Sequence, residues 1–340
     1  MRALLVLACI AGCQADFDRD RVAIGFGSTR GAADRPEGFE VCRVTSLADD
    51  GEGSLRACLV PGREVVFDVG GEIALRDWLD IPDYVTLRGE TAPGGITLAA
   101  LEDSGVISIE GRDVIVRNVR VRGAGFTSGA RIALCGAERV ILEHLVVHSA
   151  RTGISIIGGS RDVTIRNSLF AELSSGINAH GTVGCESTRH ERITVARNVF
   201  HRVNERAPRF AGGSQLQVVN NIVHGWHWFE LGSAALALED LNDNGVFPSQ
   251  IDVVGNAFVG GPGEDDNAIG VAAGVTNVFA IENEVPPSEA DLIGLGADPQ
   301  TGVDFASTLE RVLDTVGPSP LNDQERGWVT AVRGALSGAP

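Results

Sequence analysis

The chain has 340 residues, of which 44% are hydrophobic, and its formal net charge is −17, from 28 basic residues against 45 acidic ones. This is the composition of a globular chain with a sizeable core, and its acidity argues against nucleic-acid binding, which needs a basic surface. Every basic residue is Arg, and an anionic polysaccharide would be repelled unless positive charge is gathered locally or a cation intervenes.

The first residues have the pattern of an export signal. A short basic start precedes an apolar run over residues 3–11, which is too short to cross a membrane as a helix. The run ends in Ile10-Ala11-Gly12-Cys13, which resembles the bacterial lipoprotein box. The resemblance implies cleavage before Cys13, a lipid on its sulfur and, because Gln14 follows, an outer-membrane or cell-surface location. An ordinary cleaved signal, giving a periplasmic or secreted protein, and an uncleaved tail are the alternatives.

Export would leave four cysteines in an oxidising compartment, where an even number favours disulfides. Cys42 and Cys58 would close a short local loop and are the first choice. Cys135 then pairs with Cys185 by elimination. Four buried thiols are the alternative.

Short β-rich runs with alternating apolar residues recur along most of the chain. The clearest are residues 65–69, 85–87, 114–116, 140–142, 163–165, 193–195, 216–218 and 251–253. Most are followed within three residues by a corner Asn or His, namely Asn118, His144, Asn167, Asn198, Asn221 and Asn256. Such a repeat is typical of a solenoid, and intervening segments such as residues 153–159 have no helical period. We predict an all-β fold, a right-handed single-stranded parallel β-helix, with stacked Asn side chains at its corners.

The ends of a solenoid must be covered. Ser54 is a suitable N-cap for a short helix that would cover the first coil. Residues 307–316 and 324–336 are predicted helices at the other end. We therefore expect four parts: a signal peptide over residues 1–12, a polar tether over 13–22, the β-helix over 23–300 and a helical tail over 301–340 that packs on it.

Several motifs, in the same order along the chain, resemble the pectate lyase family of polysaccharide lyases. They are Val44-Thr45-Ser46-Leu47, Gly53-Ser54-Leu55-Arg56, residues 66–71, residues 87–95, Glu143-His144, Arg206-Ala207-Pro208-Arg209-Phe210 and Val218-Val219-Asn220-Asn221. The resemblance covers about residues 23–260 and implies a lyase that cleaves an acidic, uronate-containing polysaccharide by β-elimination. In that reaction a base takes the proton α to the C6 carboxylate, and the C4 glycosidic oxygen leaves.

The resemblance also implies which residues act. The first Arg of the Arg-x-Pro-Arg motif is the base, which is Arg206 here, and Arg209 is its partner and carboxylate clamp. Residues 189–209 contain six Arg against two Glu, a local exception in an acidic chain. Simple solvation of the outer face is the alternative for Arg189, Arg192 and Arg197, and also for Arg206 and Arg209.

Five further side chains are candidates for this site. His180 resembles the family's His-Gly segment and would assist as acid or base, although a loop His bonded to backbone is the alternative. His201 and Arg202 are expected to contact substrate. Trp226 and Trp228 would stack on sugar rings or, as the alternative, fill the space between coils.

Metal ligands are the main departure from the family. The resemblance implies Ca²⁺ held by acidic side chains, but the corresponding positions are Ala130, Thr152 and Ile156, none of which offers a carboxylate. Calcium is therefore possible only by resemblance, and no histidine spacing suggests zinc. Four acidic loop residues could instead form a calcium site or a glycosidase pair: Asp240, Asp243, Asp265 and Asp266.

These observations favour an exported, pectate lyase-like enzyme. The alternative is a non-catalytic, lipid-anchored surface β-helix that binds glycan or has a structural role, because the calcium ligands are missing. We expect a monomer whose partner is a polysaccharide and whose only contact with a membrane is the N-terminal lipid.

Overall fold

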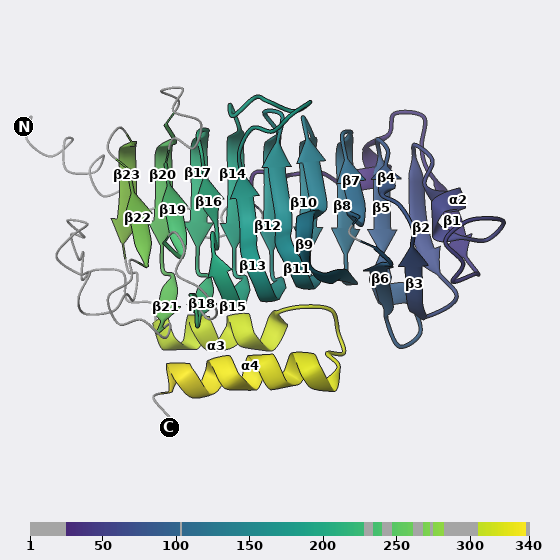
Figure 1. Cartoon of the computed structure of the whole chain (residues 1–340). Coiled ribbons are helices and arrows are strands. Elements are labelled where there is room, and N and C mark those ends of the chain that lie inside the picture. The colour runs from purple at the N-terminus through teal and green to yellow at the C-terminus, as the bar shows by residue number, and fades with distance from the viewer. Residues whose placement is uncertain are drawn as a thin grey trace, which may run out of the picture.

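A computed structural model describes residues 25–102, 104–227, 234–239, 247–260, 268–272, 275–281 and 305–337. Within these ranges, residues 126–128, 276, 277, 279–281 and 305–307 are described by their backbone alone. All the strand pairs are parallel, and the strands form two sheets that wind together as one solenoid (Figure 1). The predicted parallel β-helix is confirmed.

The first sheet has ten strands in chain order, so each coil adds one strand to it. The strands are β1 (Glu40–Val44), β2 (Arg63–Phe67), β5 (Val85–Arg88), β8 (Arg112–Arg117), β10 (Glu138–Glu143), β12 (Arg161–Arg166), β14 (Glu191–Ala196), β17 (Ser214–Val219), β20 (Ser249–Val254) and β23 (Thr276–Ile281). All eight predicted runs overlap strands of this sheet, and only the run over residues 65–69 extends beyond its strand, by two residues.

The second sheet has thirteen strands and bends into two faces. The strands are β3 (Gly71–Leu75), β4 (Leu79–Ile81), β6 (Ile96–Ala100), β7 (Ile107–Ile109), β9 (Val119–Cys135), β11 (Val146–Ile157), β13 (Leu169–Ala179), β15 (Val199–Glu205), β16 (Arg209–Phe210), β18 (Ile222–His224), β19 (Leu236–Leu238), β21 (Ala257–Val259) and β22 (Ile269–Val271). Strands β9, β11 and β13 run through both faces, so their N-terminal and C-terminal halves lie on different sides of the coil. We call these two sides of the second sheet its N-terminal face and its C-terminal face.

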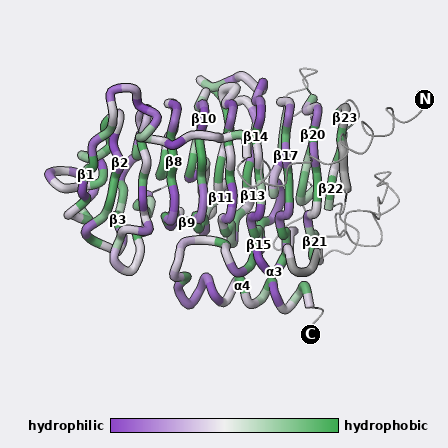
Figure 2. Tube along the Cα trace, turned by 180° about the vertical axis from the view of Figure 1, so that it is seen from behind, coloured by the Kyte–Doolittle hydropathy of each residue, from purple (hydrophilic) through white to green (hydrophobic). Residues whose placement is uncertain are grey.

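Alternating side chains place the core inside the coil. Phe170 and Phe200 point inward on neighbouring strands and stack at 4.9 Å between ring centroids. Figure 2 shows hydrophobic residues recurring along the strands and hydrophilic ones at the turns. Since each coil cannot bury its apolar side chains alone, the stack of coils forms one continuous core.

An asparagine ladder runs along one corner. Nδ2 of Asn198 donates to Oδ1 of Asn221 at 3.1 Å, and Nδ2 of Asn221 donates to Oδ1 of Asn256 at 2.9 Å. All three side chains are buried, so the ladder satisfies amides that would otherwise lose hydrogen bonds inside the coil.

The other predicted corner residues belong to a different row. Asn118, His144 and Asn167 have φ of 56°, 53° and 50°, and they lie one residue before the ladder position. Ser168, which follows Asn167, occupies the ladder position, and its N–H donates to Oδ1 of Asn198 at 3.0 Å. The prediction of a single corner row is therefore wrong. Asn occurs in one row because it tolerates a left-handed backbone, and in the other row because its side-chain amide forms hydrogen bonds along the ladder.

The N-terminal part covers the first coil and crosses the first sheet. Ser54 caps α2 (Leu55–Cys58) by accepting from the N–H of Ala57, as predicted. The 3₁₀ helices η1 (Gly31–Asp34) and η2 (Gly89–Thr91) also lie here. The segment before β1 lies along the outer face, where Gly27 N donates to Thr164 Oγ1 at 2.8 Å and Ala32 N donates to Thr86 Oγ1 at 3.0 Å.

Two helices, α3 (Phe305–Thr315) and α4 (Asp323–Leu336), form a hairpin on the N-terminal face of the second sheet (Figure 1). Leu313 and Trp328 pack in one apolar cluster with outward residues of the sheet such as Val146 and Leu169. None of the helices in the described ranges is long and apolar enough to cross a membrane.

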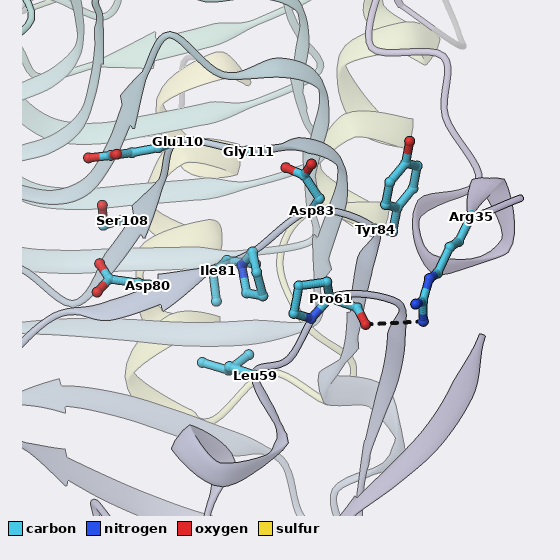
Figure 3. Close-up of a pocket in the computed structure, with 11 residues that line it drawn as sticks. Arg35, Leu59, Pro61, Asp80, Ile81, Asp83, Tyr84, Ser108, Glu110 and Gly111 are labelled. Atoms are coloured by element: carbon cyan, nitrogen blue, oxygen red, sulfur yellow. Dashed lines mark hydrogen bonds between the residues drawn. The ribbon is translucent and has the colours of Figure 1, made fainter. Parts of the chain in front are cut away.

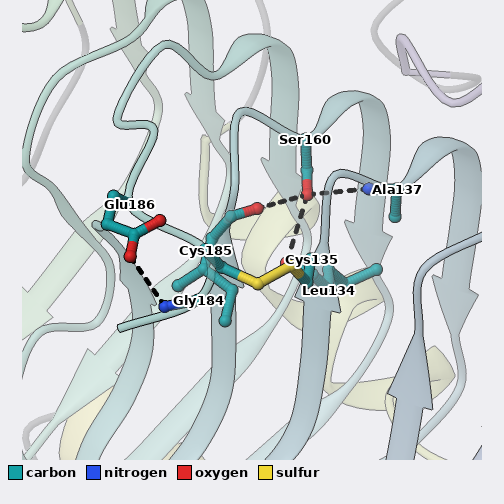
Figure 4. Close-up of a disulfide and its surroundings, with 8 residues drawn as sticks. Leu134, Cys135, Ala137, Ser160, Gly184, Cys185 and Glu186 are labelled. Carbon is teal, nitrogen blue, oxygen red and sulfur yellow. Dashed lines mark hydrogen bonds between the residues drawn. A yellow bond between two sulfur atoms is a disulfide. The ribbon is translucent and has the colours of Figure 1, made fainter. Parts of the chain in front are cut away.

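Both predicted disulfides are present. Cys42 pairs with Cys58 beside the first coil, across 16 residues, and Cys135 pairs with Cys185 across 50 residues. The second bridge fastens the loop after β13 to the end of β9 (Figure 4).

Candidate active site

The candidate site lies on the C-terminal face of the second sheet, where two rows of side chains point outward. Strand register gives one row as Ala130, Thr152, Ser175 and Glu205, and the other as Ala133, Ser155, Asn178 and Arg209. Between the rows, Ile154 and Ile177 point into the core. Residues one coil apart in the sequence are therefore neighbours on this face.

Arg206 lies at the turn after β15, with φ of 61°. Its Nη1 is 2.8 Å from Oε1 of Glu205 and donates to Oγ of Ser175 at 3.2 Å. The Arg206 side chain is 27% exposed, so this guanidinium can meet a ligand from solvent.

Arg209 is more deeply placed, at 3% exposure. Its Nε donates to Oδ1 of Asn178 at 2.8 Å, and its Nη1 lies 3.0 Å from Oε1 of Glu239. Burial, together with the positive charge of Arg206, lowers the pKa of Arg209 to about 10. The two arginines of the motif are therefore close enough to repel each other.

His180 lies beside this pair. Its Nδ1 is 2.8 Å from the carbonyl oxygen of Gly181. Burial lowers the pKa of His180, and the charges of Arg209 and Arg206 lower it further. The structure thus gathers Arg206, Arg209 and His180 on one face, although His180 also makes the backbone contact that was its alternative role.

The face does not fit Ca²⁺. Ala130 and Thr152 lie on the outward row without a carboxylate, and both nearby carboxylates, Glu205 and Glu239, face guanidinium groups. Within the described ranges, no three His, Cys, Asp or Glu residues are grouped to hold a metal ion. A calcium ion needs several oxygen ligands, which this donor set does not supply.

Ile156, the third position compared with a family calcium ligand, does not reach the surface. That side chain is fully buried in the core because it points inward with Leu134 and Ala179. Because side chains alternate along the strand, Ser155 is the outward residue at this level, and it offers a hydroxyl and no carboxylate.

The predicted substrate contacts do not all reach this face. His201 is buried on the N-terminal face, where its ring stacks on His224 at 5.0 Å between centroids and the two Nδ1 atoms are 2.9 Å apart. Arg202 is exposed at the bend of β15, with φ of 50°, between that face and Arg206. A groove role for His201 is not supported by this burial.

Trp226 is 2% exposed and belongs to the core cluster. The prediction that Trp226 stacks on a sugar ring is therefore wrong, and the alternative, that its ring fills space between coils, agrees with its burial. Trp228 lies outside the described residues, as do four acidic candidates and the lipidation candidate: Asp240, Asp243, Asp265, Asp266 and Cys13.

The basic stretch over residues 189–209 is divided among faces by the winding of the chain. Arg192 lies on the first sheet and pairs there with Asp162 at 2.6 Å. Arg197 follows the same strand, and Arg189 is exposed before it. Only Arg206 and Arg209 of this stretch lie on the candidate face, so local positive charge is smaller than the sequence suggests.

Four side chains of the site were not predicted: Ser175, Asn178, Glu205 and Glu239. The available signal was spacing, because Ser175–Glu205, Asn178–Arg209 and Arg209–Glu239 are separated by 30, 31 and 30 residues, the length of one coil here.

These features define a parallel β-helix protein with an arginine pair, one member partly exposed and one buried, on one face. Residues 148–281 match the family model described as pectate lyase. A probable pectate lyase C from Aspergillus flavus is 33% identical over 258 residues, which cover 74% of this chain and 57% of that protein. The chain therefore spans little more than half the length of this relative.

Solved structures agree on the fold. The cedar pollen allergen jun a 1 has a TM-score of 0.61 at 17% identity, over 89% of this chain and 96% of that one. The pectate lyase Bsp165PelA from Bacillus sp. N165, in complex with trigalacturonate, has a TM-score of 0.53 at 14% identity, over 87% and 100% of the two chains. The family model, the curated relatives and the solved structures together support a parallel β-helix of the pectate lyase family.

Proposed function

We propose that the protein is a polysaccharide lyase that cleaves an acidic, uronate-containing polysaccharide by β-elimination. The observation that carries the proposal is the position of Arg206 and Arg209, which lie together on one face of the coil, Arg206 partly exposed and Arg209 buried, with Ser175 and Asn178 holding their guanidinium groups. The likeness to pectate lyases supports the same reaction class.

In the proposed reaction, neutral Arg206 takes the proton from C5 of the uronate. The electrons of that C–H bond form the C4=C5 double bond, the bond from C4 to the glycosidic oxygen breaks, and this oxygen leaves with a proton. Negative charge grows on the substrate carboxylate as the proton departs, and fixed positive charge stabilises it. Arg209 supplies that charge from its buried position.

An arginine keeps its proton at ordinary pH, so the site must disfavour a second positive charge. Arg209 lies close enough to do so, and its own pKa is lowered to about 10 by burial first and by the charge of Arg206 second. His180, close to both arginines, is proposed to return a proton to the leaving oxygen. No step uses Ca²⁺.

The test is the absorbance of unsaturated product on several uronate polymers, near neutral and at alkaline pH, with Ca²⁺ or with a chelator. We expect product in the presence of chelator and none from Arg206→Ala. The control Arg161→Ala removes an exposed arginine from the first sheet and keeps activity. Undiminished product from Arg206→Ala, or no product on any polymer, would refute the proposal.

We further propose that the protein is exported and carries lipid on Cys13. The two disulfides support an oxidising compartment. Mass spectrometry of the mature N-terminus, with Cys13→Ala as the control, tests this: a diacylglyceryl adduct on Cys13 is expected, and cleavage at another position without lipid would overturn it.

A further inference from the structure

A pocket of about 800 Å³ lies near the first coils, away from the arginine pair. It is formed at the corner between β4 and β5 and by the neighbouring turn after β7. Figure 3 shows Asp80, Ser108 and Glu110 together on one side of the pocket, with Tyr84 and Arg35 on the other. The residues that line the pocket are all within the described ranges.

The pocket and the candidate active site lie on one row of the same face. Register across adjacent strands joins six positions, in order Asp80, Ser108, Ala133, Ser155, Asn178 and Arg209. Since neighbouring strands are about 4.8 Å apart, the two ends of the row are separated by roughly 24 Å, the length of a short oligosaccharide. Along this row Asp80 is exposed and Ser108 and Ala133 are half-buried, whereas Ser155, Asn178 and Arg209 are buried. A polysaccharide that meets the exposed guanidinium of Arg206 and lies across the strands would therefore pass over the buried part of the row and reach the pocket.

The two ends of the row differ in charge. Asp80 and Glu110 are exposed, and neither carboxylate has a hydrogen bond or ion pair with any described residue. Asp83 in the same pocket is 3.6 Å from Arg112, and Arg35 is 3.4 Å from Glu37. The free carboxylates therefore repel a uronate at the pocket end, whereas the arginines attract one at the other end.

The lining suits an uncharged sugar. Leu59, Pro61 and Tyr84 offer apolar and aromatic surface to the C–H face of a sugar ring or to an ester methyl group. Free carboxylates accept strong hydrogen bonds from sugar hydroxyls. We propose that this pocket is a distal subsite for an uncharged residue of the polysaccharide, either an esterified uronate or a neutral sugar.

This inference rests on the proposed function only for the identity of the polymer, and binding tests it separately from cleavage. Affinity electrophoresis with native protein compares polygalacturonate, the same polymer highly methyl-esterified, and a neutral 1,4-linked galactan. The two uncharged arms distinguish ester recognition from neutral-sugar recognition. The parent protein is expected to bind at least one of them more tightly than polygalacturonate.

The double variant Asp80→Asn/Glu110→Gln removes both free charges. It is expected to bind polygalacturonate about threefold to tenfold more tightly, as relief of like-charge repulsion of about 1 kcal/mol predicts. Tyr84→Ala is expected to weaken binding of the preferred uncharged polymer by a similar factor. The control Asp50→Asn/Glu52→Gln removes two exposed charges from the loop before α2 and should leave all three affinities unchanged.

Three outcomes would overturn the subsite: equal binding of all polymers by the parent, no gain for polygalacturonate in the double variant, or the same gain in the control. The production of unsaturated product is measured separately. If the protein cleaves a polymer but shows no such binding differences, the proposed function stands and the subsite is refuted. If it shows the expected binding differences but does not cleave, the subsite stands and the proposed function is refuted.

Discussion

Arg209 and Asn178 face each other across adjacent coils, and Nε of the guanidinium donates to the amide Oδ1 at 2.8 Å. The contact fixes a charged group that is almost wholly buried. A buried charged donor without an acceptor is costly, so the amide of Asn178 stabilises the buried guanidinium. It also fixes the position of Arg209 relative to Arg206, on which the proposed chemistry depends.

Asn178→Ala is therefore expected to lower the free energy of unfolding by about 1–3 kcal/mol, the usual cost of leaving a buried donor unpaired. It should also lower kcat of the proposed lyase, because Arg209 loses its fixed orientation. The control is Ser155→Ala, one strand earlier in the same row, whose hydroxyl has no hydrogen-bond partner among the described residues. Chemical denaturation and initial rates check both effects; equal stability of the two variants would contradict the assignment.

Glu205 offers a test of substrate contact at Arg206. Its Oε1 is 2.8 Å from Nη1 of Arg206, so an anion lies beside the guanidinium that is proposed to meet the uronate. Glu205→Gln removes an anion that repels the substrate carboxylate, so KM for a uronate polymer should fall severalfold. Glu191→Gln, an exposed carboxylate on the first sheet, should keep the parent KM. An unchanged KM in Glu205→Gln would argue against contact between Arg206 and the uronate.

The two disulfides form a matched pair for experiment. Cys135–Cys185 holds the loop that follows His180, and Cys42–Cys58 lies at the capped end of the coil. Replacing either pair with Ala should lower the free energy of unfolding by about 2–4 kcal/mol, with the larger loss for the longer loop.

Only loss of Cys135–Cys185 should raise KM, because it loosens the loop beside the arginine pair. Thermal unfolding and steady-state kinetics of Cys135→Ala/Cys185→Ala and Cys42→Ala/Cys58→Ala distinguish the effects. A similar rise of KM in both variants would mean that the loop has no local role.

The repeating strands of the first sheet were predictable because they alternate apolar and polar residues and end at corner Asn or His residues. The second sheet was not. Segments such as residues 153–157 combine glycine, serine and buried isoleucine. Each is part of a long strand that bends between the two faces, here β11. The alternation of apolar and polar residues in these segments lasts only a few positions, and the sequence gives no turn signal at the bend, which Arg202 makes with a left-handed backbone in β15.

The arginine pair was accessible from the sequence because it lies within one short motif. Glu239 was not, because it meets Arg209 only once the coil length between them is known. The prediction for Trp226 was wrong for a related reason. The sequence marks an aromatic cluster, but only the path of the chain after β18 decides whether the ring points into the core or out of it.

Buried histidines predict how stability depends on pH. Burial, with the nearby His224 and Arg202, lowers the pKa of His201 from 6.5 to about 4. The unfolded chain then binds the proton more readily, so the free energy of unfolding falls as pH falls from about 6.5 to about 4. His201→Gln should flatten this part of a curve of denaturation midpoint against pH, by at most about 3 kcal/mol over the window. Gln324→Ala, exposed on α4, should keep the parent slope, and an unchanged slope in His201→Gln would contradict the prediction.

The helical hairpin is joined to the coil by a buried ion pair. Nε of Arg120, on β9, lies 2.6 Å from Oε1 of Glu325 on α4, and the two side chains are 9% and 2% exposed. Oδ1 of Asn322 accepts from the N–H of Glu325, whose carboxylate accepts from the N–H of Asn322 in return, so the same glutamate also caps the helix.

Glu325→Gln leaves the Arg120 charge buried without its counter-charge, which costs about 3–5 kcal/mol in comparable pairs. We expect that loss in the free energy of unfolding, together with faster proteolysis between α3 and α4. Glu310→Gln breaks an exposed pair with Arg333 and should cost less than about 1 kcal/mol. Replacing both members of the buried pair, with Arg120→Met and Glu325→Leu, should restore most of the lost stability, because no isolated charge remains. If the double variant is as unstable as Glu325→Gln, the helix cap rather than the buried charge determines how the hairpin is held.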